Sequence, residues 1–129
     1  MIDSDRPEEI VAYNENSLEE LAWAIESSVG NFKLILARCN YTNLRNRLAQ
    51  RLQEICTVAI RSIQLKETEQ ALYTRIQAEI NSELPAALMV FGLESVTELE
   101  RLLSAANQVR EEFQKNCPFP LILWINDEV

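Results

Sequence analysis

Three apolar runs of this sequence are each followed, within a few residues, by side chains able to bind a ligand. These candidate site residues are Asn40, Thr42, Arg45, Glu94, Asn126 and Asp127. Carboxylate and amide oxygens suit Mg²⁺, while a guanidinium beside a helix N-terminus suits an anion. If the runs are parallel strands, these side chains meet at one edge of a sheet, where open α/β proteins bind ligands. The alternative is that strand-to-helix turns are polar for structural reasons alone.

The segment CNYTNLR, residues 39–45, lies where nucleotide-binding α/β proteins carry a phosphate loop. A Walker A loop needs glycines, so that successive backbone N–H groups wrap a phosphate, together with a Lys and a Ser or Thr. Thr42 and Arg45 are present, but glycine and lysine are absent from the segment. We therefore expect no conventional triphosphate site and at most weak binding of ATP or ADP with Mg²⁺. Alternatively, Thr42 or Asn40 is a plain helix N-cap.

The residue types also limit catalysis. The chain contains no histidine, which excludes a His-containing zinc site and a Ser-His or Cys-His couple. Cys39 ends a strand before a helix, a place where a thiol can be activated, but no histidine base is available to it. We predict no catalytic residue and no metal site. Three widely spaced cysteines, Cys39, Cys56 and Cys117, favour buried thiols in a reducing compartment over a disulfide framework.

Charge and hydropathy narrow the range of partners. The net charge of −8 argues against nucleic acid, which binds through Lys and Arg. Between Lys33 and Lys66 there are seven basic residues and one acidic residue, which predicts a basic patch around one helix or, alternatively, an ordinary solvated helical face. No stretch approaches the ~20 apolar residues of a membrane span, and the first residues do not resemble a signal peptide. We expect a cytoplasmic protein with no membrane partner.

Four apolar runs predict strands, at residues 32–39, 57–65, 86–93 and 121–126. Arg61 and Gln64 interrupt the second run, which favours an edge position for it. A helical pattern precedes each strand, and alternation of this kind predicts a three-layer α/β/α fold with a four-stranded parallel sheet.

The predicted helices have their own start signals. Ser17 with Glu20, and Thr97 with Glu100, have the spacing of capping boxes. The apolar side of the first helix is predicted to comprise Leu18, Leu21, Trp23, Ala24 and Ile25.

The domain boundaries follow from composition. Residues 1–16 are rich in acids and are expected to form a flexible tail, while residues 17–129 form a single domain. The last strand carries Trp124 and several large aliphatic residues and needs cover on both faces. Because four strands leave little material for that cover, we expect the N-terminal module of a longer protein, or a protein partner. The alternative is that the existing helices suffice.

Several long segments together resemble a known family: GNFKLILARCNYTNLRNRL, PAALMVFGLESVTELERLL, NQVREEF and PFPLILWINDEV. They are similar to the N-terminal α/β domain of multidomain cyanobacterial proteins that carry tetratricopeptide or WD repeats, a set related in organisation to STAND-type signalling NTPases. The resemblance covers about residues 17–129. It implies a P-loop-like sheet order of 1-4-3-2, with Glu94 near the Walker B position and Asn126 at the sensor position. A flavodoxin-like order is the alternative.

Since Walker A has no match, the resemblance implies a degenerate module that keeps the fold. We therefore expect a non-catalytic regulatory or protein-interaction module, whose partner is another protein or a downstream repeat domain. The alternative is an atypical nucleotide-binding or NTP-hydrolysing domain that uses the candidate site residues.

Overall fold

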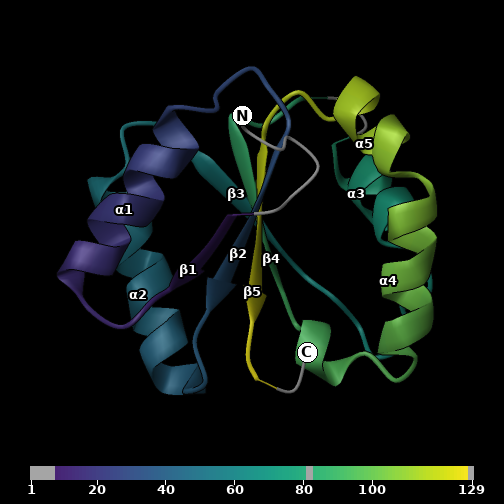
Figure 1. The fold of residues 1–129 in the computed structure, drawn as a ribbon, viewed down its shortest axis with the longest axis horizontal. Coiled ribbons are helices and arrows are strands. Elements are labelled where there is room, and N and C mark those ends of the chain that lie inside the picture. The colour runs from purple at the N-terminus through teal and green to yellow at the C-terminus, as the bar shows by residue number, and fades with distance from the viewer. Residues whose placement is uncertain (1–7, 81–82, 128–129) are drawn as a thin grey trace.

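The computed structural model describes residues 8–80 and 83–127. Its strands are β1 (Glu8–Val11), β2 (Lys33–Arg38), β3 (Ile60–Gln64), β4 (Ala87–Phe91) and β5 (Pro120–Ile125). Its helices are α1 (Glu15–Glu26), α2 (Thr42–Ile55), α3 (Leu72–Glu79), α4 (Leu99–Gln108) and α5 (Arg110–Asn116), with a short 3-10 turn, η1 (Leu93–Ser95). The strands form one parallel sheet in the order β1-β2-β5-β4-β3, with helices on both sides (Figure 1). The predicted α/β class is confirmed.

The side on which each helix lies follows from the path of the chain across the sheet. From β1 through β2 to β3 the chain advances in one direction, and from β3 through β4 to β5 it returns. Because crossovers between parallel strands are right-handed, this reversal places α1 and α2 on one face and α3, α4 and α5 on the other. Figure 1 shows these two groups of helices on opposite sides of the sheet.

The predicted number of strands is wrong, because residues 8–11 of the expected acidic tail form β1. Ile10 and Ala12 are buried under α1, so this short segment contributes to the core. The remainder of the expected tail before it, residues 1–7, lies outside the described residues. A four-stranded sheet of order 1-4-3-2 does not describe the molecule, since β1 adds a strand beside β2, and the flavodoxin-like order is not found either. The strands in the four expected segments stand side by side as β2-β5-β4-β3, with β3 at the predicted edge.

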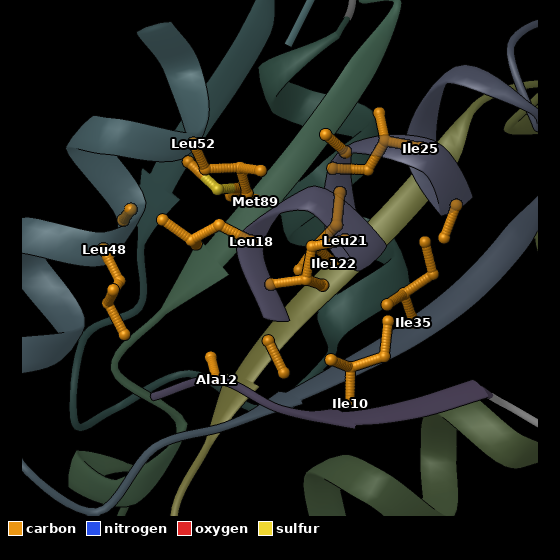
Figure 2. Packing of buried hydrophobic residues seen from close by; sticks show 14 of the residues in the cluster. Ile10, Ala12, Leu18, Leu21, Ile25, Ile35, Leu48, Leu52, Met89 and Ile122 are labelled. Carbon is orange, nitrogen blue, oxygen red and sulfur yellow. The ribbon is translucent and has the colours of Figure 1, made fainter. Parts of the chain in front are cut away.

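The first core lies between the sheet and the helices α1 and α2. Leu18, Leu21 and Ile25 of α1 are fully buried, and their spacing of three and four residues places them on one side of the helix. Figure 2 shows them packed among Ile10, Ile35, Met89 and Ile122 of the sheet and Leu48 and Leu52 of α2. Trp23 was predicted on this side and is instead 68% exposed. It lies two residues after Leu21, which places its side chain on the opposite side of the helix.

The second core fills the other face of the sheet. Alternate residues of β4 and β5 point into it, including Leu88, Val90 and Leu121, and they meet Leu102 and Phe113 of the covering helices. All six residues of β5 are buried. The expectation that this strand lacks cover is therefore wrong, because β5 lies in the middle of the sheet and not at an edge.

Both predicted capping boxes are wrong. The first helix begins earlier: Asn14 is its N-cap, its side chain accepts from Ser17 N–H at 3.0 Å, and Ser17 Oγ accepts from Asn14 N–H at 3.0 Å. Helix α4 begins at Leu99 and has no side-chain cap. The box signal is local, and it misplaced the two N-caps by three residues and by one residue, since they are Asn14 and Glu98.

The carboxyl edge of the sheet as candidate site

Arg45 and Glu94 come together where β4 ends and α2 begins. Arg45 Nη1 donates to Glu94 Oε1 at 2.8 Å, and the side chains are 12% and 24% exposed. The guanidinium also lies over the ring of Phe91, 5.3 Å from its centroid. Behind Phe91, the indole of Trp124 is stacked at 6.1 Å with an interplanar angle of 6°. Arg45 thus occupies a position between an aromatic face and a carboxylate.

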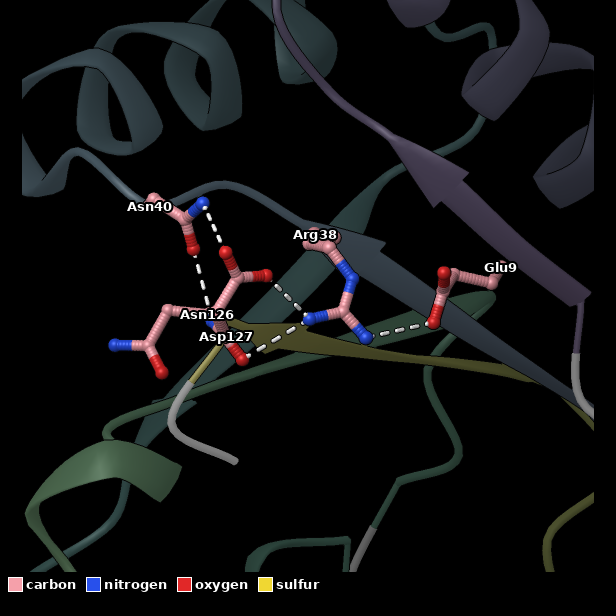
Figure 3. Close-up of polar contacts among 5 residues, drawn as sticks. All are labelled: Glu9, Arg38, Asn40, Asn126 and Asp127. Carbon is pink, nitrogen blue, oxygen red and sulfur yellow. Dashed lines mark hydrogen bonds and ion pairs between the residues drawn. The ribbon is translucent and has the colours of Figure 1, made fainter.

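A second group of contacts joins the ends of β2 and β5 (Figure 3). Asn40 Nδ2 donates to Asp127 Oδ2 at 2.9 Å, and Asp127 N–H donates back to Asn40 Oδ1 at 2.8 Å. Arg38 extends this group, since its Nη1 donates to Asp127 Oδ1 at 2.8 Å and to the Asn126 carbonyl at 3.3 Å. Its Nη2 donates to Glu9 Oε1 of β1 at 2.9 Å. Arg38 therefore connects three neighbouring strands.

Thr42 is the predicted site residue that neither group includes. It is the first residue of α2 and is exposed, while Tyr41 occupies the N-cap position without a side-chain hydrogen bond. The interpretation of Thr42 or Asn40 as an N-cap is therefore wrong. Asn40 uses its amide to hold the segment after β5 instead.

Sequence reasoning missed the roles of Arg38, Glu9 and Phe91 at this edge. Arg38 was noted only as one of the basic residues, and Glu9 only as an acid of the expected tail. The usable signal was the separation of charge along the chain, since an acidic N-terminal segment precedes a basic one. Nothing in the local sequence indicated that the ring of Phe91 would lie against the guanidinium of Arg45.

Part of the expected basic patch is neutralised within the described residues, where three of its seven basic residues form ion pairs. Arg38, Arg45 and Arg51 form ion pairs, Arg51 with Glu15 at 2.9 Å and with Glu54 at 3.2 Å. The hydrogen bonds that Arg51 donates to these carboxylates raise the pKa of its guanidinium further above the usual range. Arg61 donates to the carbonyls of Glu79 and Glu83, both at 3.3 Å, close to the C-terminal end of α3. The guanidinium groups of Arg38, Arg45, Arg51 and Arg61 are therefore engaged by acceptors within the described chain.

The geometry determines what this edge can do chemically. A phosphate approaching Arg45 would meet the carboxylate of Glu94, which already accepts from that guanidinium. Within residues 8–80 and 83–127, no three cysteine or carboxylate side chains are grouped as a metal site would require. The three cysteines are unpaired and buried, as predicted, and burial raises the pKa of the Cys56 and Cys117 thiols. Thiols in this state are poor nucleophiles.

Comparisons with known proteins do not identify this site. In the part of the chain that the structure describes, no helix has the length and apolar character needed to cross a bilayer. No protein-family model, no curated protein and no solved structure matches the chain.

Proposed function

We propose that this chain is a non-catalytic protein-interaction module, built on an α/β fold without a phosphate loop. The proposal rests mainly on the uneven cover of the sheet. On the side of α1 and α2, the buried core includes residues of β1, β2, β5 and β4. On the opposite side, among the described residues, β2 contributes the partly buried Leu34 and Leu36, and Val11 of β1 is 52% exposed. The ion pair of Arg38 with Glu9 borders these residues on the same face. Residues Val11, Leu34 and Leu36 are named here the open sheet face.

An apolar sheet face left partly open is a common feature of interaction surfaces. Burial of large aliphatic side chains against a partner stabilises the complex, by roughly 25 cal/mol per Å² of apolar surface removed from water. Exposed aromatic residues add to this argument. Tyr13, Trp23 and Tyr41 are 64%, 68% and 71% exposed, and such residues often dominate binding energy at interfaces.

The carboxyl edge supports the non-catalytic part of the proposal. Its polar groups are engaged with one another, as in the pairs Arg45 with Glu94 and Asn40 with Asp127. In the family that the sequence resembles, the partner would be another protein or a downstream repeat domain in a signalling protein. Three unpaired cysteines support a cytoplasmic setting.

The test compares what the chain binds before and after the open sheet face is altered. The wild type, Val11→Asp and the control Leu84→Asp are used as baits with chemical cross-linking and mass spectrometry. Leu84 is 57% exposed, so the control makes the same kind of change at another surface position. We expect specific partners to be retained by the wild type and the control and lost by Val11→Asp. Identical sets for all three baits would contradict an interface at this face.

Nucleotide binding is the alternative, and it has a separate test. A ligand present at 100 times its Kd adds about 2.7 kcal/mol to stability, which raises Tm by several degrees. Our proposal expects no shift with millimolar ATP or ADP and Mg²⁺. A shift in the wild type that is lost in Glu94→Gln and in Arg45→Ala would favour an atypical nucleotide site and overturn the non-catalytic assignment.

A further inference from the structure

Helix α1 presents an acidic and aromatic outer face. Its inner side is fixed by the buried residues Leu18, Leu21 and Ile25. Glu19, Glu20 and Trp23 are exposed on the opposite side, and Trp23 follows the two glutamates by one helical turn. Positions three and four residues apart are neighbours on a helix surface, so these three side chains share one exposed face. We refer to Glu19, Glu20 and Trp23 as the α1 outer face.

The charge on this face is not balanced within the described chain. Helix α1 carries four glutamates and no basic residue. Glu15 is paired with Arg51 at 2.9 Å, and Glu26 accepts two hydrogen bonds from Thr57 at 2.7 Å. By contrast, no ion pair or hydrogen bond joins the side chain of Glu19 or Glu20 to any other residue in the described ranges.

We propose that the α1 outer face docks an arginine- or lysine-rich segment of a protein partner. A cation above the indole gains a cation–π interaction, and the neighbouring carboxylates complement its charge. The chain already makes this type of contact internally, since the guanidinium of Arg45 lies over Phe91 and pairs with Glu94. The net charge of −8 would also attract a basic partner from a distance. A nucleic acid or an anionic membrane would be repelled.

This inference rests on the proposed function, because it requires a binding module, but it concerns a different surface. Ile10 and Ala12 point toward α1, so Val11, between them, faces the other side of the sheet. Separate substitutions can therefore test the α1 outer face and the open sheet face.

The tryptophan residues provide a direct readout. Trp23 is 68% exposed and Trp124 is fully buried, so a fluorescence change on peptide binding reports on Trp23. The probe is a ten-residue peptide of alternating Arg and Ser, and its Glu-Ser counterpart is the control peptide. We expect a saturable change with the Arg-Ser peptide that weakens as salt is added, and none with the control peptide. Absence of a saturable change with the Arg-Ser peptide would overturn the inference.

Variants then locate the binding site. Glu19→Gln combined with Glu20→Gln should weaken binding about fivefold to tenfold, since two exposed charge pairs are lost. Trp23→Ala, followed by the anisotropy of a labelled peptide, should weaken it about threefold to tenfold. The matched control is Glu100→Gln with Glu111→Gln, which removes two exposed charges from α4 and α5 on the other side of the sheet. We expect this control to stay within about twofold of the wild type.

Two outcomes would overturn the proposed location. If the control double variant weakens binding as much as the α1 double variant, peptide binding depends on the net charge of the protein and not on the α1 outer face. If Val11→Asp abolishes binding while the α1 double variant retains it, the basic segment docks on the open sheet face. In that second case the interaction module stands and the inference about α1 fails. Melting temperatures of all variants check that each remains folded.

Discussion

Arg45 lies between the carboxylate of Glu94 and the ring of Phe91 at the carboxyl edge of the sheet. Its type and its place after a strand indicated an anion-binding group. In the fold its guanidinium pairs with Glu94, which lies 49 positions away, and covers the ring of Phe91. The pairing partner is remote in the sequence, so no local pattern could reveal it.

Gly92 occupies a position where any larger residue would be strained. It has φ +94°, and a Cβ there would come within 2.9 Å of the Leu65 carbonyl oxygen and would also meet the side-chain amide of Gln64. Gly30 has φ +87°, but a Cβ there would meet open space. Gly30→Ala should cost about 1–2 kcal/mol for the left-handed backbone alone. Gly92→Ala should cost at least about 1 kcal/mol more, because the new atom also clashes with its neighbours.

Urea unfolding of the two glycine variants measures this difference directly. Equal losses of stability would show that the turn after β4 relaxes away from β3, and the packing argument at Gly92 would then fail.

At the scale of elements, the side chains of β1 alternate between the first core and the other side of the sheet. Ile10 is 4% exposed and contributes to the first core, while its neighbour Val11 is 52% exposed on the other side of the sheet. Ile10→Ala should lower the free energy of unfolding by about 2–4 kcal/mol, because it leaves a cavity under α1. Val11→Ala should cost less than about 1 kcal/mol. Chemical denaturation of both variants tests whether β1 is docked, and similar small losses would contradict its place in the core.

The junction of α1 and α2 should respond to pH through Glu26. Its carboxylate accepts from the Thr57 hydroxyl and from the Thr57 N–H, and these bonds lower its pKa below the ordinary value of 4.5. A lowered pKa in the folded state adds stability above the unfolded pKa, and that stability is lost as pH falls through the folded pKa. Glu26→Gln should therefore lower Tm near pH 7, with a smaller difference from wild type below about pH 4.

Melting curves of the wild type and Glu26→Gln across this pH range provide the measurement. Glu19→Gln is the control, since Glu19 is exposed on the same helix and accepts no hydrogen bond from another side chain in the described ranges. A Glu26→Gln difference that stays constant from neutral to acid pH would rule out a contribution from the charged carboxylate.

At the scale of the whole molecule, two cores share one sheet. Side chains of β4 and β5 alternate between them: Met89 and Trp124 belong to the first core, and Val90 and Leu123 to the second. Because β4 and β5 contribute to both cores, separating these strands would expose both cores to water. We therefore expect one cooperative unfolding transition. Trp fluorescence, which reports on Trp124 in the first core, and far-UV circular dichroism, which reports on all helices, should give the same midpoint. Separate midpoints would show that the two helical layers unfold independently.

The sequence by itself determined the class of this fold. Continuous apolar runs and helical periods of three to four residues are local features, so the four strands and the helices between them could be recognised from the sequence alone. The interruptions at Arg61 and Gln64 likewise placed β3 at an edge. The same reasoning missed β1, because its four residues carry two acids and too short an apolar pattern.

Only the tertiary structure decided which residues meet. Burial of Ile10 under α1 outweighed the acidic composition of the N-terminal segment, and Arg38 neutralised Glu9 from the next strand. The central place of β5 explains why all six of its residues are buried, while Val11 of the edge strand β1 is 52% exposed. These outcomes depend on contacts between segments far apart in the chain. Their free energy comes from burial and charge pairing, which exist only once the sheet has formed.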